Sequence, residues 1–344
     1  MNLFLGESED AVALRSELIR TFPGVSVESA TSGLFIVKGM PDQPAALSPV
    51  VFSRQMLPNA HLHHLASIRN WSDLLADEII RTFPENQPWQ LHVAPYYGNP
   101  VAGENRCRLI QECLQETLKA RRRHLLRQWD KSAVVWTAQY SLAQLLLTSP
   151  DSGYLSLAPT PQPFNQRQLI SRFVKGWVPI ASDKAAPSRA FTKLVEAEAR
   201  LGLKIAAAET CVDLGASPGS WSYVALQRGA KVIAVDRSPL RPDLMQHPQL
   251  TFQQGDAFKF TPAEPVDWLL CDVIAAPERS IQLVLDWTRQ RLARKFVVTI
   301  KFKGTEGYEK LEILKQQLPA LCQEFYLTRL CANKNEACAF GITR

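Results

Sequence analysis

The sequence lacks any apolar run long enough to cross a bilayer, and one of its longer apolar stretches is only LAQLLL at residues 142–147. The first ten residues, MNLFLGESED, lack the basic start and extended apolar core of a secretory signal peptide. We therefore expect a cytoplasmic protein that has no membrane partner.

The seven cysteines form no C-x-x-C pair, and no histidine spacing accompanies them. They are Cys107, Cys113, Cys211, Cys271, Cys322, Cys331 and Cys338. A zinc site or a disulfide framework would show such spacings. We expect reduced, buried thiols that act as small hydrophobic side chains, and no bound metal.

The charge imbalance is small: 39 basic and 33 acidic residues give a net charge of +6, with a pI near 8.9. This favours a polyanionic partner without requiring one. The densest basic run, KARRRHLLR, lies on a helix expected over residues 106–129. Its candidate RNA-binding side chains are Lys119, Arg121, Arg122, Arg123 and Arg127. A solvated helix face explains the same run, so both interpretations stay open at this point.

With 344 residues, the chain is long enough for two or three domains. A proline-rich passage, LAPTPQPFNQRQ, indicates a linker before the last of them. We predict a small α/β unit at residues 1–48, a second unit at 49–158, a linker at 159–185 and a final domain at 186–344. In the first two units we expect strands at 2–5, 25–38 and 89–95, helices at 11–22 and 71–83, and a strand within 133–149.

The final domain alternates short apolar strands with helices, which predicts a doubly wound α/β sheet. Its most specific feature is CVDLGASPGSW at residues 211–221, an apolar strand followed by a glycine turn and a helix. In such sheets this edge binds ligands, because loops form a crevice and a helix N-terminus offers free N–H groups. Asp236 ends the next strand and can accept hydrogen bonds from ribose hydroxyls.

The turn does not fit a dinucleotide well, because its pattern is not G-x-G-x-x-G and Pro218 lacks an N–H donor for a pyrophosphate. A ligand without phosphates, S-adenosylmethionine, fits better. Later strand ends add Asp256, which could accept from an adenine amino group, together with Asp272 and Lys301. The candidate cofactor-binding residues are Asp213, Gly215, Ala216, Ser217, Pro218, Gly219, Trp221, Asp236, Asp256 and Asp272.

Five segments in this order, PSRAFTKL, DLGASPGSW, LLCD, TIKFKG and NKNEACAF, resemble the FtsJ-like family of RNA ribose 2'-O-methyltransferases. The resemblance covers about residues 186–344. It implies a catalytic tetrad at the matching positions Lys193, Asp272, Lys301 and Glu336. One departure is Ser220, where the family commonly has a second glycine.

The likeness is greatest to the bacterial branch that methylates a cytidine of 23S ribosomal RNA and has an N-terminal THUMP-type RNA-binding domain. It implies a Rossmann-like methyltransferase domain preceded by an α+β RNA-binding region, THUMP-like over residues 49–158. S-adenosylmethionine is the implied cofactor. The implied partner is 23S ribosomal RNA or its assembly precursor, and we expect a monomer or weak homodimer.

The tetrad implies how the reaction proceeds, since a ribose hydroxyl is a poor nucleophile at neutral pH. Lys301 is the candidate base, while Lys193 positions the hydroxyl and disfavours the protonated form of Lys301. Asp272 and Glu336 orient the lysines. Alternatives are a transfer-RNA ribose methyltransferase and a non-catalytic RNA-binding ribosome-assembly factor. A nicotinamide-dependent oxidoreductase would leave the paired lysines unexplained.

Overall fold

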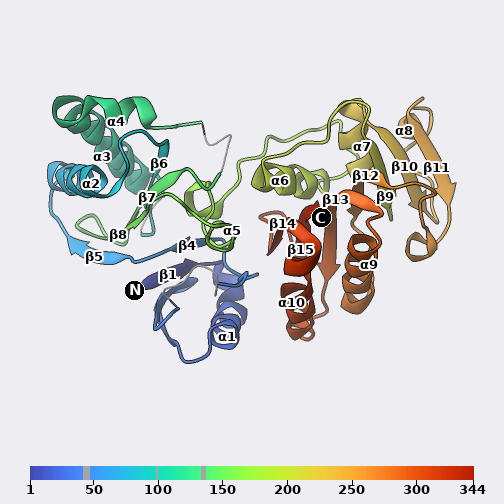
Figure 1. The fold of residues 1–344 in the computed structure, drawn as a ribbon, viewed down its shortest axis with the longest axis horizontal. Helices are drawn as coiled ribbons and strands as arrows, with labels where there is room; N and C mark the ends of the chain where they lie inside the picture. Colours follow the sequence, from blue (N-terminus) through green and yellow to red (C-terminus); the bar gives the residue numbers. More distant parts are fainter. Residues whose placement is uncertain (42–46, 98–99, 133–136) are drawn as a thin grey trace. The chain divides into compact units, whose positions relative to one another are not determined.

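The computed structural model describes residues 1–41, 47–97, 100–132 and 137–344. Two compact units make up the chain, Met1–Trp177 and Val178–Arg344 (Figure 1). Each unit has its own sheets and its own core, so they are described separately.

The first unit contains two four-stranded sheets. An antiparallel sheet has the order β2-β3-β1-β4, and a mixed sheet has the order β5-β8-β7-β6 with β6 and β7 parallel. The strands are β1 (Asn2–Leu5), β2 (Ser26–Thr31), β3 (Leu34–Lys38), β4 (Gln55–Leu57), β5 (His61–His64), β6 (Trp89–Pro95), β7 (Ser141–Leu147) and β8 (Ser152–Ala158). The helices are α1 (Ala11–Thr21), α2 (Ile68–Thr82), α3 (Pro100–Arg121), α4 (Arg123–Gln128) and α5 (Phe164–Arg167).

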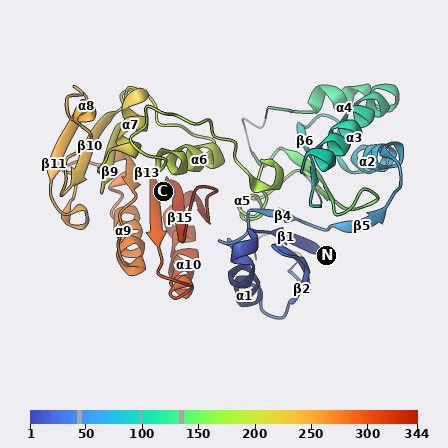
Figure 2. The same ribbon diagram turned by 180° about the vertical axis from the view of Figure 1, so that it is seen from behind.

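The mixed sheet is buried on both faces, which explains the uninterrupted apolar run of β7. One face packs against α2 and α3, where Trp71 and Leu114 join Leu145 in one core cluster. The other face packs against the antiparallel sheet, where Leu146 lies in a cluster with Leu3. Figure 2 shows the same unit from behind, with α1 beside β1 and β2.

Three predicted segments of this unit differ in the structure. The strand expected over 25–38 is a hairpin, because Gly33 turns the chain with a φ of +79°. The helix expected over 106–129 breaks at Arg122, whose φ of −152° is not helical. Of the strand expected within 133–149, residues 133–136 lie outside the described residues, and β7 begins at Ser141.

The passage predicted as a linker is packed into the first unit as far as Trp177. The side-chain amide of Gln55 pairs with the backbone of Ser171, donating to its carbonyl over 3.0 Å and accepting from its N–H over 2.5 Å. Leu169 and Ile170 are buried. Because β4 carries Gln55 and joins the first sheet, residues beyond 48 also complete that sheet.

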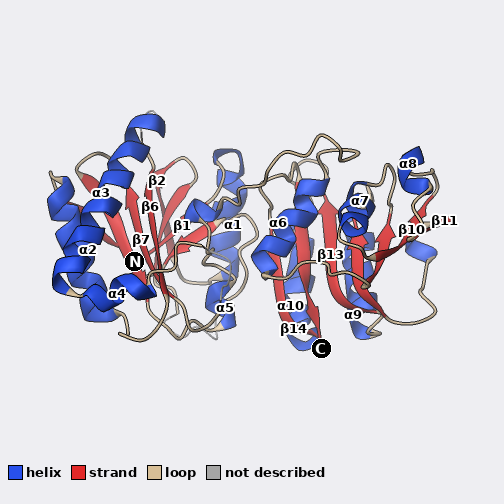
Figure 3. Cartoon of the chain, turned by 90° about the horizontal axis from the view of Figure 1, so that it is seen from above, coloured by secondary structure: helices blue, strands red, loops and turns tan. Residues whose placement is uncertain are grey.

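The second unit is built on one seven-stranded sheet with the order β11-β10-β9-β12-β13-β15-β14. The strands are β9 (Thr210–Leu214), β10 (Lys231–Asp236), β11 (Leu250–Gln254), β12 (Val266–Cys271), β13 (Ala293–Lys301), β14 (Cys322–Thr328) and β15 (Glu336–Thr343). The helices are α6 (Phe191–Leu201), α7 (Ser220–Gln227), α8 (Pro242–Met245), α9 (Pro277–Arg289) and α10 (Glu312–Leu321). Figure 3 shows α6 and α7 on one face and α9 and α10 on the other. The predicted Rossmann-like doubly wound sheet is confirmed.

The strand order creates a crevice at one edge of this sheet. The chain proceeds outward from β9 to β10 and β11, then returns to β12 on the other side of β9. Loops therefore diverge between the carboxyl ends of β9 and β12, which is where such folds bind ligands. Since β15 is antiparallel to β13, its first residue, Glu336, lies opposite Lys301 at the same edge.

Candidate active site

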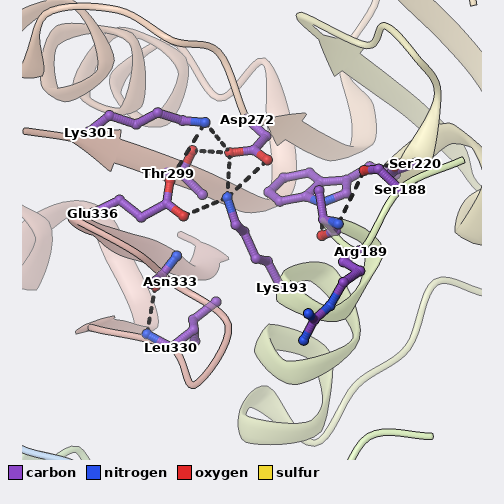
Figure 4. Close-up of polar contacts among 12 residues, drawn as sticks. Ser188, Arg189, Lys193, Ser220, Asp272, Thr299, Lys301, Leu330, Asn333 and Glu336 are labelled. Carbon is purple, nitrogen blue, oxygen red and sulfur yellow. Dashed lines mark hydrogen bonds and ion pairs between the residues drawn. The ribbon is translucent and has the colours of Figure 1, made fainter. Parts of the chain in front are cut away.

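Four charged side chains meet at this edge of the sheet (Figure 4). The Lys193 ammonium lies 3.1 Å from each carboxylate oxygen of Asp272 and 2.6 Å from Oε1 of Glu336. The Lys301 ammonium lies 2.9 Å from Oδ1 of Asp272 and 3.6 Å from Oε2 of Glu336. The side chains come from α6, the end of β12, the end of β13 and the start of β15, so the fold assembles the tetrad from distant segments.

The two lysines differ in their surroundings. Lys193 is only 8% exposed, whereas Lys301 is partly exposed and lines a cavity. Burial by itself would lower the pKa of Lys193, but the carboxylates of Asp272 and Glu336 outweigh burial and raise that pKa. Lys193 therefore stays protonated, and Lys301 is the lysine that faces the cavity.

A fifth residue, Thr299, contacts the tetrad. Its hydroxyl donates a 2.7 Å hydrogen bond to Oδ1 of Asp272, the oxygen that both lysines contact. Thr299 is fully buried and lies two residues before Lys301 on β13, so its side chain points to the same face of the sheet. Sequence reasoning missed it: the alternation along TIK places Thr299 on the same face of the strand as Lys301, but it does not show the contact with Asp272.

The glycine turn brings backbone close to the crevice. Gly215 has a φ of +73°, and a Cβ there would lie 2.3 Å from Cγ2 of Val273. Behind the turn, the buried Asp213 accepts hydrogen bonds from the N–H (2.9 Å) and hydroxyl (2.7 Å) of Ser222 in α7. Burial raises the pKa of Asp213 to about 7. Position 215 therefore needs glycine, both for its left-handed conformation and for the close approach of Val273.

Two further carboxylates, those of Asp236 and Asp256, lie at the end of β10 and just after β11. Asp236 accepts from the N–H groups of Ser217 (3.0 Å) and Ser238 (2.9 Å), and half of its four acceptor positions remain available. Asp256 accepts from the N–H of Phe258 at 3.0 Å and lies 3.2 Å from the Arg237 guanidinium. Both carboxylates are therefore oriented by the backbone at the edge of the crevice.

Two adjoining cavities of about 370 and 210 Å³ occupy the crevice and share Gly215, Asp236, Val273 and Ile274. Of the predicted cofactor residues, Asp213, Gly215, Ala216, Ser217, Pro218, Trp221, Asp236 and Asp272 line the larger cavity, and Asp256 lines the smaller. Gly219 lines neither cavity, and instead provides the left-handed N-cap of α7. Sequence reasoning missed Val273 and the 87%-exposed Ile274, because apolar loop residues give no distinctive signal.

The predicted RNA-binding side chains lie in the first unit, away from the tetrad in sequence, and all five are exposed. Arg121 pairs with Asp77 at 2.5 Å, and Lys119 lies 3.5 Å from Glu116. In the described part of the chain, Arg122, Arg123 and Arg127 have no ion-pair partner.

Residues 186–325 match the family described as FtsJ-like methyltransferase. This region carries the glycine turn and three of the four tetrad residues.

Curated relatives are similar to part of this chain. The chain is 32% identical over 183 residues to a protein named Ribosomal RNA large subunit methyltransferase M from Teredinibacter turnerae, covering 52% of this chain and 50% of the relative. A protein of the same name from Laribacter hongkongensis is 39% identical over 141 residues, covering 39% and 40%. The alignments thus span half or less of the length of these relatives.

Solved structures give a weaker likeness. A putative hemolysin from Lactococcus lactis is 18% identical, covers 47% of this chain and 90% of that one, and has a TM-score of 0.39. We draw no conclusion from a score this low. Among the described residues, no helix is long and apolar enough to span a membrane, and no cluster of three His, Cys, Asp or Glu side chains could hold a metal ion.

Proposed function

We propose that the FtsJ-like domain transfers a methyl group from S-adenosylmethionine to a ribose 2'-hydroxyl of RNA. One observation carries this proposal: two lysines and two carboxylates form a closed charge cluster, and only one of the lysines, Lys301, lines the cavity. Since the hydroxyl needs a base beside the methyl donor, this is the arrangement that the reaction requires.

The residues around the cavity fit S-adenosylmethionine. The carboxylates of Asp236 and Asp272 line the larger cavity, which suits a cationic ligand and disfavours a pyrophosphate. Asp236 retains acceptor positions for two ribose hydroxyls. The exposed Ile274 offers an apolar surface that an adenine ring would cover. When bound, the cofactor supplies an electrophilic methyl group on a positively charged sulfur.

The tetrad residues then have separate roles. Lys193, held protonated by Asp272 and Glu336, provides a fixed positive charge behind the position of the ribose hydroxyl. Lys301 accepts the hydroxyl proton at Nζ, after losing its own proton to solvent. Asp272 and Glu336 keep both nitrogens in place throughout.

We further propose that the substrate is large-subunit ribosomal RNA, 23S RNA or its assembly precursor. The curated relatives are named Ribosomal RNA large subunit methyltransferase M, and the match to the FtsJ-like methyltransferase family covers three of the four tetrad residues. The first unit, with its exposed arginines, would add RNA affinity, and its THUMP-like character is part of the proposal. Methylation of transfer RNA is the alternative substrate. A non-catalytic role would leave the tetrad geometry without a purpose.

The proposal is tested by methyl transfer in vitro. The full chain is incubated with labelled S-adenosylmethionine and with unmodified large-subunit ribosomal RNA or a transfer-RNA pool. Label in alkali-resistant dinucleotides of the ribosomal RNA supports ribose methylation, because a methylated 2'-oxygen cannot attack the adjacent phosphate. Label in bases, or only in transfer RNA, would contradict the proposed position or substrate.

A further inference from the structure

The two lysines of the tetrad meet at one oxygen, Oδ1 of Asp272, and the Thr299 hydroxyl donates to the same atom (Figure 4). The Thr299 contact is the shortest of these, at 2.7 Å, against 2.9 Å for Lys301 and 3.1 Å for Lys193. The positions of both ammonium groups therefore depend on one carboxylate, and Thr299 is a neutral donor that helps to hold it.

Core packing does not explain the hydroxyl of Thr299. The residue is fully buried in β13, the strand between β12 and β15, and valines stand just before it at positions 297 and 298. A buried hydroxyl costs free energy unless it is hydrogen-bonded, so packing alone favours the isosteric valine at such a position. The hydroxyl finds its compensation at Asp272, where a hydrogen bond to a charged group is roughly twice as strong as a neutral one.

Thr299 is also a more rigid donor than the lysines. Its side chain is branched at Cβ, which restricts χ1, and its strand is paired with a neighbour on each side. Each lysine instead reaches the carboxylate through a flexible four-carbon stem. Asp272 itself comes one residue after the end of β12. The hydroxyl thus ties a side chain beyond the strand end to the interior of the sheet.

Lys301 depends on this oxygen more than Lys193 does. The Lys193 ammonium has a second carboxylate, Glu336, at 2.6 Å, whereas Lys301 lies 3.6 Å from Glu336, beyond ordinary hydrogen-bond length. Lys301 also lines the open cavity, where less protein surrounds its nitrogen. A turn of the Asp272 carboxylate would therefore displace Lys301, and a misplacement of about 1 Å can reduce a rate about 10²-fold.

We propose that Thr299 is a positioning residue for methyl transfer: its hydroxyl fixes Asp272, and through Oδ1 it fixes the nitrogen of Lys301. Thr299 lines neither of the two cavities of the crevice, so it acts through Asp272 and touches no substrate. This inference rests on the proposed function for the step that is affected, and it adds a residue outside the four of the tetrad.

The test compares three single variants of the full chain. Thr299→Val keeps the shape and removes the hydroxyl, whereas Thr299→Ser keeps the hydroxyl and removes the methyl group. Thr343→Val is the matched control, because Thr343 is a buried threonine at the far end of β15 from Glu336, and its hydroxyl has no partner among the described residues. The measurements are S-adenosylmethionine affinity, RNA affinity and single-turnover methyl transfer.

For Thr299→Val we expect a single-turnover rate about tenfold to hundredfold lower, the range for a misplaced reacting group, with both affinities near those of the wild type. Thr299→Ser should recover most of the rate, and Thr343→Val should keep it. A packing role predicts the opposite order, since valine fills the space that serine leaves. Wild-type transfer by Thr299→Val, or a Thr299→Ser variant as slow as Thr299→Val, would overturn the proposal.

Denaturant unfolding gives a readout that needs no methyl transfer. Because Thr299 and Lys301 contact the same oxygen, their contributions to the free energy of unfolding should be coupled. The losses in Thr299→Val and Lys301→Met should therefore not add in the double variant, whereas those in Thr343→Val and Lys301→Met should add. Additive losses in both pairs would contradict the link between Thr299 and Lys301.

These outcomes separate the positioning role from the proposed function. If the wild type methylates RNA and Thr299→Val does so at the same rate, the positioning role is wrong and the proposed function stands. If the wild type transfers no methyl group but the Thr299 and Lys301 losses are coupled, the link through Asp272 stands and the proposed function fails.

Discussion

Lys193 and Lys301 contact the same oxygen, Oδ1 of Asp272, at 3.1 and 2.9 Å. Their nitrogens are therefore no more than 6.0 Å apart, the sum of those two distances. Lys193 is buried and also contacts Glu336 at 2.6 Å, whereas Lys301 is 3.6 Å from Glu336 and lines the cavity. This asymmetry makes Lys193 the fixed charge and leaves Lys301 as the lysine that faces the cavity.

Replacing Asp236 should impair cofactor binding more than folding. Asp236→Ala removes the proposed acceptor of the ribose hydroxyls, and a hydrogen bond to a charged group contributes roughly 1.5–3 kcal/mol. We expect S-adenosylmethionine affinity to fall about tenfold to hundredfold by calorimetry. Asp243→Ala is the matched control, because Asp243 is an exposed carboxylate of the same unit that pairs with Arg241. Wild-type cofactor affinity in Asp236→Ala would remove Asp236 from the site.

The raised pKa of Asp213 makes stability depend on pH. Its pKa is raised from 3.8 to about 7 in the folded chain, so the folded state holds its proton more tightly than the unfolded state. The resulting stabilisation is complete below pH 3.8 and is lost as pH rises to about 7. Asp213→Asn keeps an oxygen to accept from Ser222 and never ionises.

We therefore expect Asp213→Asn to exceed the wild type in free energy of unfolding at pH 8, by an amount on the order of 1–3 kcal/mol, since one pKa unit corresponds to about 1.36 kcal/mol. Denaturant unfolding without cofactor at pH 8 and pH 5 measures the difference. The advantage should shrink at pH 5. If Asp213→Asn were less stable than the wild type by the same amount at pH 8 and at pH 5, the Asp213 carboxylate would be ionised in the folded chain.

The exposed arginines of the first unit should contribute to RNA affinity through phosphates. Changing Arg122, Arg123 and Arg127 to alanine in one triple variant should weaken RNA binding. The slope of log Kd against log salt concentration should also fall by up to about 2, at about 0.7 per phosphate contact. The control replaces Arg69, Arg81 and Arg108, which are exposed in the same unit and already paired with carboxylates. If this slope decreases by the same amount in both triple variants, the basic run has no special role and is a solvated helix face.

Much of the site could be predicted from sequence, because it depends on where strands end. Apolar strands followed by Asp236, Asp256 and Asp272 identified one edge of a parallel sheet, and strand ends converge there. Sequence could not show that Thr299 completes the carboxylate contacts of Asp272, because a buried threonine in a strand is common in any core. The approach of Glu336 to Lys301 depends on the register between β13 and β15, which local sequence does not encode.

The first unit was harder to predict because its order depends on distant contacts. Gln55 bonds to Ser171 across more than a hundred residues, and this contact places a proline-rich passage in a folded unit. The break at Arg122 separates two stretches that both favour a helix locally. Leu125 is buried, so tertiary packing of the second stretch overrides the continuous helix that local preference predicts.

The most direct test of the account measures single-turnover methyl transfer by Lys301→Arg on a verified RNA substrate. Arginine keeps the positive charge but does not lose its proton at any working pH, so it cannot serve as the base. We predict nearly unchanged S-adenosylmethionine affinity and a rate at least about 10²-fold lower, as expected for a lost general base. The wild-type rate should rise with pH and then level off. Near wild-type transfer by Lys301→Arg would contradict the central claim and limit Lys301 to an electrostatic role.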